Sequence, residues 1–436
     1  MREHHKNNDL HNSYWAGIFG CMMTGFTQDY FAPFVLLLGG SAFHVGILNS
    51  INHLLSSLTQ PLSANLATKF QSRRSVVLSF NFLQIISLLV LTLFAINIAG
   101  NIYAVIILIA CFSAFGSMTH PCWVSILSDL VNAKQRGEYF GWRARNLGFI
   151  TIAITFAAGG ILYIFNHYHP SVGFAIIFGL AWVSRIYSFL SVKKMTEPPL
   201  TMTKEADFSF WDFFRQVRSS NFAKFVLFIA GVNFSVNLAA PYFAVYMLED
   251  LSFNYLLYTL INITAPIALY SSISRWGKHA DKVGNLKILK IVAPLFSVIP
   301  LLWIISQNIL FLIFAEIVAG FLWAGFNLCS SNFIIDAVTP QKRTRCIAYF
   351  SVINGLALAA GALIGGQLLH VLPPTRGYKI LTLFLISSVF RLILGLIMPR
   401  SLKEVRSVEN VSSKQLLFSM IGLKPIAGIE RKSIQL

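Results

Sequence analysis

The sequence is poor in charged residues and lacks the motifs that mark nucleotide-driven proteins. Charged side chains make up 12% of the 436 residues, against roughly 25% in soluble domains. A soluble core could not use so much apolar surface. No phosphate-binding loop of the form G-x-x-x-x-G-K-[ST] occurs, so nothing supports coupling to ATP.

Cysteine and histidine give no sign of a disulfide framework or a metal site. The five cysteines have no paired spacing, and we expect them to be reduced. His4, His5 and His11 lack the cysteines or carboxylates that would complete a metal site. We therefore predict no metal and no cofactor.

The chain also lacks a removable leader and a concentrated basic patch. Its first residues contain no short apolar region followed by a small-residue cleavage site, so no signal peptide is predicted. The formal net charge is +17, but the lysines and arginines are spread along the chain instead of gathering on one face. This distribution argues against a nucleic-acid partner.

What the chain has in excess is apolar sequence. Hydrophobic residues make up 56% of it, and an apolar helix of about 20 residues crosses the hydrocarbon core of a lipid bilayer. We predict an all-α membrane protein with twelve transmembrane helices, at residues 13–38, 44–68, 75–98, 102–126, 140–165, 171–192, 223–247, 253–275, 287–306, 309–333, 347–370 and 378–398.

The basic residues fall almost entirely on one side of these spans. Of the 34 lysines and arginines, only Arg376 and Lys379 lie in or beside the odd-numbered connections. Because cytoplasmic loops carry the excess of Lys and Arg, both termini are predicted to be cytoplasmic. We expect an integral protein of the bacterial cytoplasmic (inner) membrane.

The two halves of the chain repeat each other. The segment DLVNAKQR, which contains Asp129, recurs as DAVTPQKR, which contains Asp336, 207 residues later. DYFAPF matches NLAAPY with an offset of 208 residues, so that Asp29 corresponds to Asn237. Near-constant offsets indicate an internal duplication. We predict a N-terminal six-helix bundle at 1–192, a cytoplasmic linker at 193–222, a C-terminal six-helix bundle at 223–398 and a cytoplasmic tail at 399–436.

One loop carries a family pattern. Between the eighth and ninth spans, GKHADKVGNLK reads G-x-x-x-D-K-x-G-x-x-K from Gly277 to Lys287. The chain resembles the major facilitator superfamily in this pattern, in its span count, in its internal repeat and in its long central connection. The first-half copy of the loop departs from the pattern, because Ala64 and Gln71 occupy the glycine positions and Thr68 the carboxylate position.

The resemblance implies two pseudo-symmetric six-helix bundles that enclose a solute path, with spans 1, 2, 4, 5, 7, 8, 10 and 11 around a central cavity. We expect the protein to act as a monomer. Asp129 is predicted to pair with Arg73 or Arg136. The residues expected to form gates at the cytoplasmic face are Gly277, Asp281, Lys282, Gly284, Asp129, Arg136, Asp336 and Arg343.

Two carboxylates, Asp29 and Glu316, fall well inside predicted spans. A charged group in hydrocarbon costs at least a few kcal/mol, so each is expected to face a wet cavity or a partner. With His53 on the second span, they are our candidates for proton coupling. The alternative for each is a buried polar group that hydrogen-bonds between helices.

Other polar and aromatic residues of the spans are candidates for the wall of the substrate cavity. They are Asn49, Ser57, Gln60, Trp123, Asn233, Asn237, Tyr242, Trp323 and Asn327. Arg185 and Arg391, a further repeat pair, are predicted instead to extend along the span toward the cytoplasmic interface. Glycines gather in the fifth and eleventh spans, where they would let helices approach closely and rock against each other.

These features favour a secondary active transporter, not an enzyme, that moves a small organic solute by alternating access and is driven by protons. Export is favoured because the cavity spans are rich in aromatic residues that suit amphipathic solutes. Proton-coupled uptake of a nutrient or siderophore is the alternative. Two other classes stay open: a transporter-like solute sensor, and a polytopic membrane transferase, which would need a cluster of acid, base or metal ligands.

Overall fold

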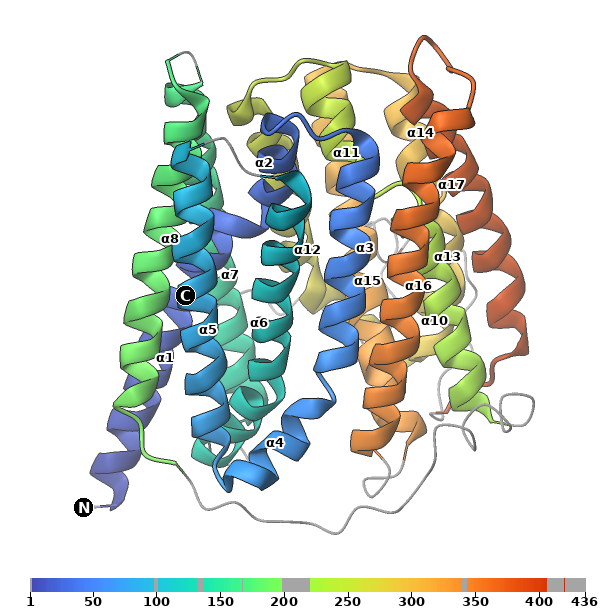
Figure 1. Cartoon of the computed structure of the whole chain (residues 1–436). Coiled ribbons are helices and arrows are strands. Elements are labelled where there is room, and N and C mark those ends of the chain that lie inside the picture. The colour runs from blue at the N-terminus through green and yellow to red at the C-terminus, as the bar shows by residue number, and fades with distance from the viewer. Residues whose placement is uncertain are drawn as a thin grey trace, which may run out of the picture. The chain divides into compact units, whose positions relative to one another are not determined.

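The computed structural model is nearly all helical (Figure 1) and describes residues 2–97, 101–131, 136–166, 168–197, 220–338, 343–405 and 419. Its elements are α1 (Arg2–Thr27), η1 (Gln28–Tyr30), α2 (Phe31–Leu37), α3 (Ala42–Thr59), α4 (Leu62–Phe70), α5 (Arg73–Asn97), α6 (Ile102–Leu130), α7 (Arg136–Phe165), α8 (Pro170–Lys193), α10 (Asn221–Asn237), α11 (Tyr242–Val245), η2 (Tyr246–Asp250), α12 (Tyr255–Val283), α13 (Asn285–Leu295), α14 (Val298–Ile305), α15 (Ile309–Ala337), α16 (Arg343–Val371), α17 (Lys379–Ile397) and η4 (Met398–Ser401).

Within the described ranges, ten helical segments are long and apolar enough to cross a membrane. They coincide with the third to twelfth predicted spans. The first two predicted spans are each interrupted, the first between α1 and α2 and the second between α3 and α4. The all-helical membrane architecture is therefore confirmed, and the count of twelve stays a prediction for these two segments.

The helix breaks in the first and seventh spans have the same local cause. Pro33 cannot donate a backbone hydrogen bond to the carbonyl of residue 29, and Pro241 cannot donate one to the carbonyl of Asn237. The first span accordingly changes to a 3₁₀ turn at Gln28–Tyr30, and α10 ends at Asn237. A break at equivalent places in both halves leaves backbone groups free to bind other partners.

The described chain forms two compact units. Unit 1 comprises Met1–Lys204, Asn237–Ile263 and Ser351–Leu383, and unit 2 comprises Glu205–Val236, Thr264–Phe350 and Phe384–Leu436. These units cut across the predicted halves at 1–192 and 223–398, whose boundaries stay a prediction. Most of the predicted linker and tail lies outside the described residues.

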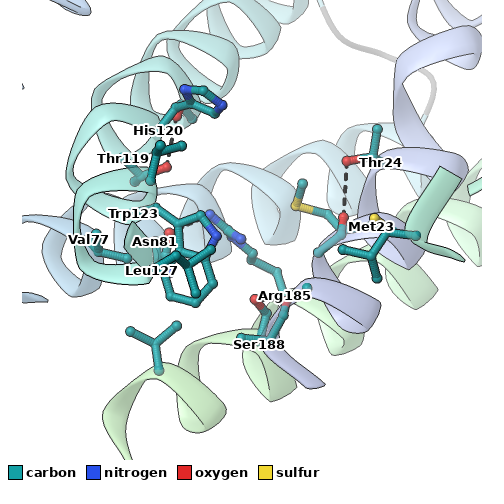
Figure 2. Close-up of a pocket in the computed structure, with 18 of the residues that line it drawn as sticks. Met23, Thr24, Val77, Asn81, Thr119, His120, Trp123, Leu127, Arg185 and Ser188 are labelled. Atoms are coloured by element: carbon teal, nitrogen blue, oxygen red, sulfur yellow. Dashed lines mark hydrogen bonds between the residues drawn. The ribbon is translucent and has the colours of Figure 1, made fainter. Parts of the chain in front are cut away.

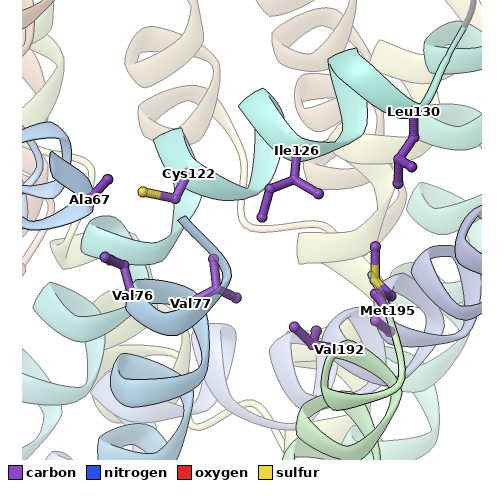
Figure 3. Packing of buried hydrophobic residues seen from close by; sticks show 9 residues of the cluster. Ala67, Val76, Val77, Cys122, Ile126, Leu130, Val192 and Met195 are labelled. Carbon is purple, nitrogen blue, oxygen red and sulfur yellow. The ribbon is translucent and has the colours of Figure 1, made fainter. Parts of the chain in front are cut away.

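One buried cluster of unit 1 consists of small and branched side chains. α1 packs on α8, and α5 packs on α6 and α8 (Figure 1). A cluster at one end of these helices joins Val77 of α5, Ile126 of α6 and Val192 of α8 (Figure 3). This packing fixes the positions of the polar side chains that α5, α6 and α8 carry nearby.

Unit 2 is tied together by Arg391, which is buried on α17 and does not extend to an interface, contrary to the prediction. Its Nε donates to Ser387 Oγ at 3.0 Å, its Nη1 to the carbonyl of Phe296 at 3.2 Å and its Nη2 to the carbonyl of Val236 at 3.1 Å. Three neutral acceptors, on α17, after α13 and on α10, therefore satisfy this guanidinium. It joins three helices of the unit.

Candidate functional site

A cavity of about 500 Å³ lies within unit 1 among α1, α5, α6, α7 and α8. Figure 2 shows side chains from several of these helices around it, including Thr119, His120 and Trp123 from α6 and Arg185 from α8. Its volume falls within the roughly 300–1,000 Å³ typical of small-molecule sites. Its wall combines apolar side chains with amides, hydroxyls and two guanidinium groups.

The first guanidinium belongs to Arg143, on α7, whose side chain is only 6% exposed. Its Nη2 donates to the carbonyl of Ser13 at 3.0 Å. The guanidinium carbon lies 5.8 Å from the ring centre of Trp123, a favourable cation–π geometry. Its Nη1 is buried and has no hydrogen-bond partner among the described residues.

The second guanidinium belongs to Arg185, on α8, which is 8% exposed. The prediction that it extends to the cytoplasmic interface is wrong, because its Nη2 donates to Asn81 Oδ1 and Gln84 Oε1, both on α5. Gln84 is held by its own bond from Nε2 to the carbonyl of Phe112 at 2.9 Å, which turns its oxygen toward the arginine. Nε of Arg185 has no partner in the described structure.

Of the predicted cavity residues, only Trp123 lines this cavity. Two of its five helices, α5 and α8, are the third and sixth spans, which the resemblance placed outside the central cavity. The residues predicted on the second span lie along α3. There Asn49 Nδ2 donates to the carbonyl of Val45 at 3.0 Å, and Ser57 Oγ to the carbonyl of Leu54 at 3.0 Å. His53 is half-buried, and Gln60 follows the last residue of α3.

Asp29, Asn237 and Tyr242 lie at the helix breaks. Asp29 is in the 3₁₀ turn with an exposed side chain, and its carbonyl, freed by Pro33, accepts a hydrogen bond of 2.7 Å from the hydroxyl of Tyr258. Asn237 is buried and its Nδ2 donates to the carbonyl of Leu358 at 2.9 Å. The hydroxyl of Tyr242 donates to the carbonyl of Ala362.

The remaining candidates lie in unit 2. Glu316 is half-buried on α15 and interacts with the indole of Trp303, on α14. Trp323 packs on Phe296 with ring centres 4.6 Å apart. Two further polar candidates are Asn327, which is exposed, and Asn233, which is half-buried on α10. Glu316 therefore faces a helix partner in its own unit.

The gate residues of the first half form an ion pair, as predicted for Asp129 and Arg73. Arg73 Nη1 lies 2.7 Å from Asp129 Oδ2, and its Nε lies 3.6 Å from Glu197 Oε1. Glu197 also accepts from the backbone of Arg73 at 2.6 Å and from Ser72 Oγ at 2.5 Å. The side chain of Arg136 lies outside the description of the structure.

The second-half gate is more helical than expected. α12 continues to Val283, so Gly277, Asp281 and Lys282 lie in its last turns and not in a loop. Only Gly284 separates α12 from α13, with a φ of +87° that favours glycine.

The carboxylate of Asp336 belongs to the same region. Its Oδ2 accepts a hydrogen bond of 3.0 Å from Nδ2 of Asn285, the first residue of α13. The side chain of Arg343 is not among those described.

Arg143, Asn81 and Gln84 are not among the site residues predicted from the sequence. One signal was available for Arg143. The position 207 residues after it in the repeat is Phe350, so the arginine is peculiar to the first half. Where one copy of the repeat has a polar residue in a span and the other copy has an apolar residue at the same position, the polar residue is a candidate for function.

Comparison with known proteins agrees with this architecture. A family model described as Major Facilitator Superfamily matches residues 15–331 and 276–427. A crystal structure of a point mutant of the nucleoside transporter NupG is 14% identical, has a TM-score of 0.72, and covers 91% of this chain and 100% of its own. Another NupG structure, also 14% identical, has a TM-score of 0.68 and covers 91% and 99% of the two chains. No curated protein matches this chain.

Proposed function

Because the chain belongs to the major facilitator superfamily, we propose that it is a secondary active transporter that moves a small organic solute across the membrane by alternating access, driven by protons. The family is one of transporters, and the described helices have the length and apolarity to span a membrane. We further propose that both termini face the cytoplasm, which places the turn at Glu249 and Asp250 outside.

One observation carries this proposal: a seam inside unit 1 between first-half and second-half segments, which we call the outer seam. It consists of the contacts of η1, α3 and α7 with α12 and α16. The hydroxyl of Tyr30 lies 2.9 Å from Thr259 Oγ1, and the hydroxyl of Tyr258 donates to the carbonyl of Asp29 at 2.7 Å. The freed carbonyl at the first helix break thus has a partner from the other half of the sequence.

Small residues also take part in the outer seam. On α16, a Cβ added at Gly355 would collide with the side chain of Ser57 and lie 3.2 Å from the carbonyl oxygen of His53. On α3, a Cβ at Gly46 would lie 3.0 Å from the carbonyl oxygen of Ala362. At these two glycines the backbones of α3 and α16 approach closely, and elsewhere along the same two helices Phe43 packs edge to face on His370 with ring centres 5.5 Å apart.

Such a seam can open without unfolding either partner. A typical intramolecular hydrogen bond contributes only about 1 kcal/mol net. Alternating access requires contacts of this kind, because they must form and break in every cycle. The seam would close the outer end of the solute path under the proposed topology.

Asp29 is our first candidate for coupling to protons. Its side chain is exposed, while its carbonyl and the adjacent Tyr30 take part in the outer seam. Gain or loss of a proton on this carboxyl would change the charge beside the seam and so favour one state of it. Glu316 ranks second because it faces Trp303, and His53 third.

Export is the proposed direction, and proton-coupled uptake of a nutrient or siderophore is the alternative. The similar solved structures are of a nucleoside transporter, so nucleosides belong in the panel of solutes to be tested. Aromatic side chains such as Trp123 suit solutes with flat, partly apolar frames.

The test is transport in proteoliposomes with an imposed pH gradient, read out as the solutes that accumulate against their own gradient. Asp29→Asn should abolish gradient-driven accumulation and leave exchange of solute between the two sides. Asp250→Asn serves as a control with the same change of charge at the end of η2. If neither pH gradient nor Asp29→Asn affects accumulation, proton coupling through Asp29 is wrong.

A further inference from the structure

The cavity in unit 1 carries positive charge that the described protein does not neutralise. Arg143 and Arg185 both line it, and none of the residues that line it is an aspartate or glutamate. Neither arginine forms a salt bridge with a described residue. Removing an ion from water costs several kcal/mol even after relaxation, so this arrangement requires a compensating interaction.

The nearby carboxylates are engaged elsewhere. Asp129 and Glu197 both pair with Arg73. Asp9 accepts hydrogen bonds from the backbone and the hydroxyl of Thr196. The described carboxylates at this end of unit 1 are therefore bound to other groups, and the cavity keeps its positive field.

The second half of the chain contains an arginine with a structural role, with which the two cavity arginines can be compared. Arg391, the repeat partner of Arg185, donates from all three nitrogens to neutral acceptors. Arg185 instead keeps an unpartnered Nε, and Arg143 keeps an unpartnered Nη1. The repeat position of Arg143 is Phe350, so the fold does not require a cation there.

We propose that this cavity binds a small organic anion, with its carboxylate or phosphate group on Arg143 and Arg185 and its carbon frame against Trp123. Guanidinium groups bind these planar or tetrahedral oxyanions with several parallel hydrogen bonds. Asn81, Gln84 and His120 add polar groups around the same space. This assignment rests on the proposed transport function and names its substrate class.

The first experiment measures binding in nanodiscs of phosphatidylcholine alone, without a gradient. Benzoate, 2-oxoglutarate and glycerol 3-phosphate are compared with glycerol, uridine and choline by thermal unfolding and tryptophan fluorescence. The anions should stabilise the protein in a saturable way, and the neutral and cationic probes should not. Equal effects of choline and the anions would overturn the proposal.

Arg143→Gln should weaken anion binding at least about tenfold, because a charge-assisted hydrogen bond contributes roughly 1.5–3 kcal/mol. Arg145→Gln is the matched control, since Arg145 is exposed two residues further along the same helix. Arg143→Lys should restore part of the affinity. Unchanged affinity in Arg143→Gln would refute the site.

Two further arms keep the test decisive if Arg143→Gln does not fold. Trp123→Leu retains both arginines and should weaken benzoate more than glycerol 3-phosphate; equal weakening would contradict the aromatic wall. Nanodiscs with phosphatidylglycerol test whether a lipid headgroup occupies the cavity. Loss of the effect of the soluble anions there would overturn their assignment as the occupant.

The outcomes distinguish this site from the proposed function. Anion binding without gradient-driven accumulation of any solute would refute the transport mechanism and leave the site intact. Accumulation of a neutral or cationic solute without anion binding would refute the site alone.

Discussion

At the scale of single residues, two turns between helices compare a glutamine with a glycine at equivalent positions of the repeat. Gln71, after α4, has a φ of +50°, and Gly284, between α12 and α13, has a φ of +87°. They occupy the same place in the repeated motif. Both residues have a positive φ, but their backbones differ: Gln71 has a ψ of +24° in the left-handed helical region, whereas Gly284 has a ψ of +157° in a region that essentially only glycine adopts.

Replacing Gln71 with glycine should therefore raise the stability of the protein, by up to about 1 kcal/mol, because a left-handed backbone costs a non-glycine residue roughly 1–2 kcal/mol. Gly284→Ala should lower stability by more, about 1–3 kcal/mol, because the backbone of Gly284 lies in a region that essentially only glycine adopts. Thermal unfolding in detergent measures both. Gly141→Ala is a control, since a Cβ there has open space; a loss of stability in Gln71→Gly would contradict the argument.

Single residues also mark the limit of sequence reasoning. The ion pair of Asp129 with Arg73 could be predicted, because both stand in a repeated motif at span ends that are predicted to be cytoplasmic. The burial of Arg185 could not, since the acceptors Asn81 and Gln84 lie on a helix about a hundred residues earlier and look unremarkable in sequence. Long-range hydrogen bonds decide whether such an arginine extends outward or stays inside.

Asp281 tests whether the gate acts on the conformational cycle. It is exposed in the last turns of α12. Asp281→Asn should slow transport and leave solute affinity within a few-fold, because the residue lies outside the cavity. Initial rates and equilibrium binding on the same preparation separate the two effects. A large loss of affinity at normal turnover would contradict this role.

At the scale of helices, apolar length predicted the third to twelfth spans to within a few residues at most ends. It did not predict the break in the first span, because hydropathy averages over the turn at Gln28–Tyr30 and over Pro33. Nor did it predict that α12 would continue through Asp281 to Val283. Local backbone geometry, not apolarity, sets these features.

The adjacent glycines of α7 provide a matched test of the outer seam. A Cβ at Gly159 would collide with the side chain of Thr259, whose hydroxyl lies beside that of Tyr30, whereas a Cβ at Gly160 meets nothing. Gly159→Ala should loosen the seam and Gly160→Ala should not. Distances between spin labels on α3 and α16 report the opening. Equal behaviour of the two variants would show that the seam does not depend on this contact.

At the scale of the whole molecule, the distribution of basic residues predicts the topology, which stays a prediction. This distribution depends on many residues at once, so it tolerates errors in individual span ends. The cavity in unit 1 depends on a few side chains of five helices and required the structure. The family could be recognised from the motif and the repeat, and its model matches nearly the whole chain.

The predicted topology of the chain in the membrane is directly testable. Single cysteines in a cysteine-free background should react with an impermeant reagent from outside at Glu249 or Asp250, and from the cytoplasmic side near Glu205. Labelling at both positions from the same side would exclude the proposed topology. Permeabilised cells serve as the control for access to the cytoplasmic position.

The buried arginines of α8 and α17 also bear on the order of synthesis. Each arginine lies on the last span of its predicted half, and its acceptors lie on segments that are synthesised earlier or on the same helix. The acceptors of Arg185 are on α5. Those of Arg391 are on α10, just after α13 and on α17 itself. A lone arginine in an inserting span costs roughly 2.5–3.5 kcal/mol. We therefore expect the last helix of each predicted half to meet the acceptors of its arginine as it enters the membrane, because those acceptors precede it in the chain or lie on the helix itself.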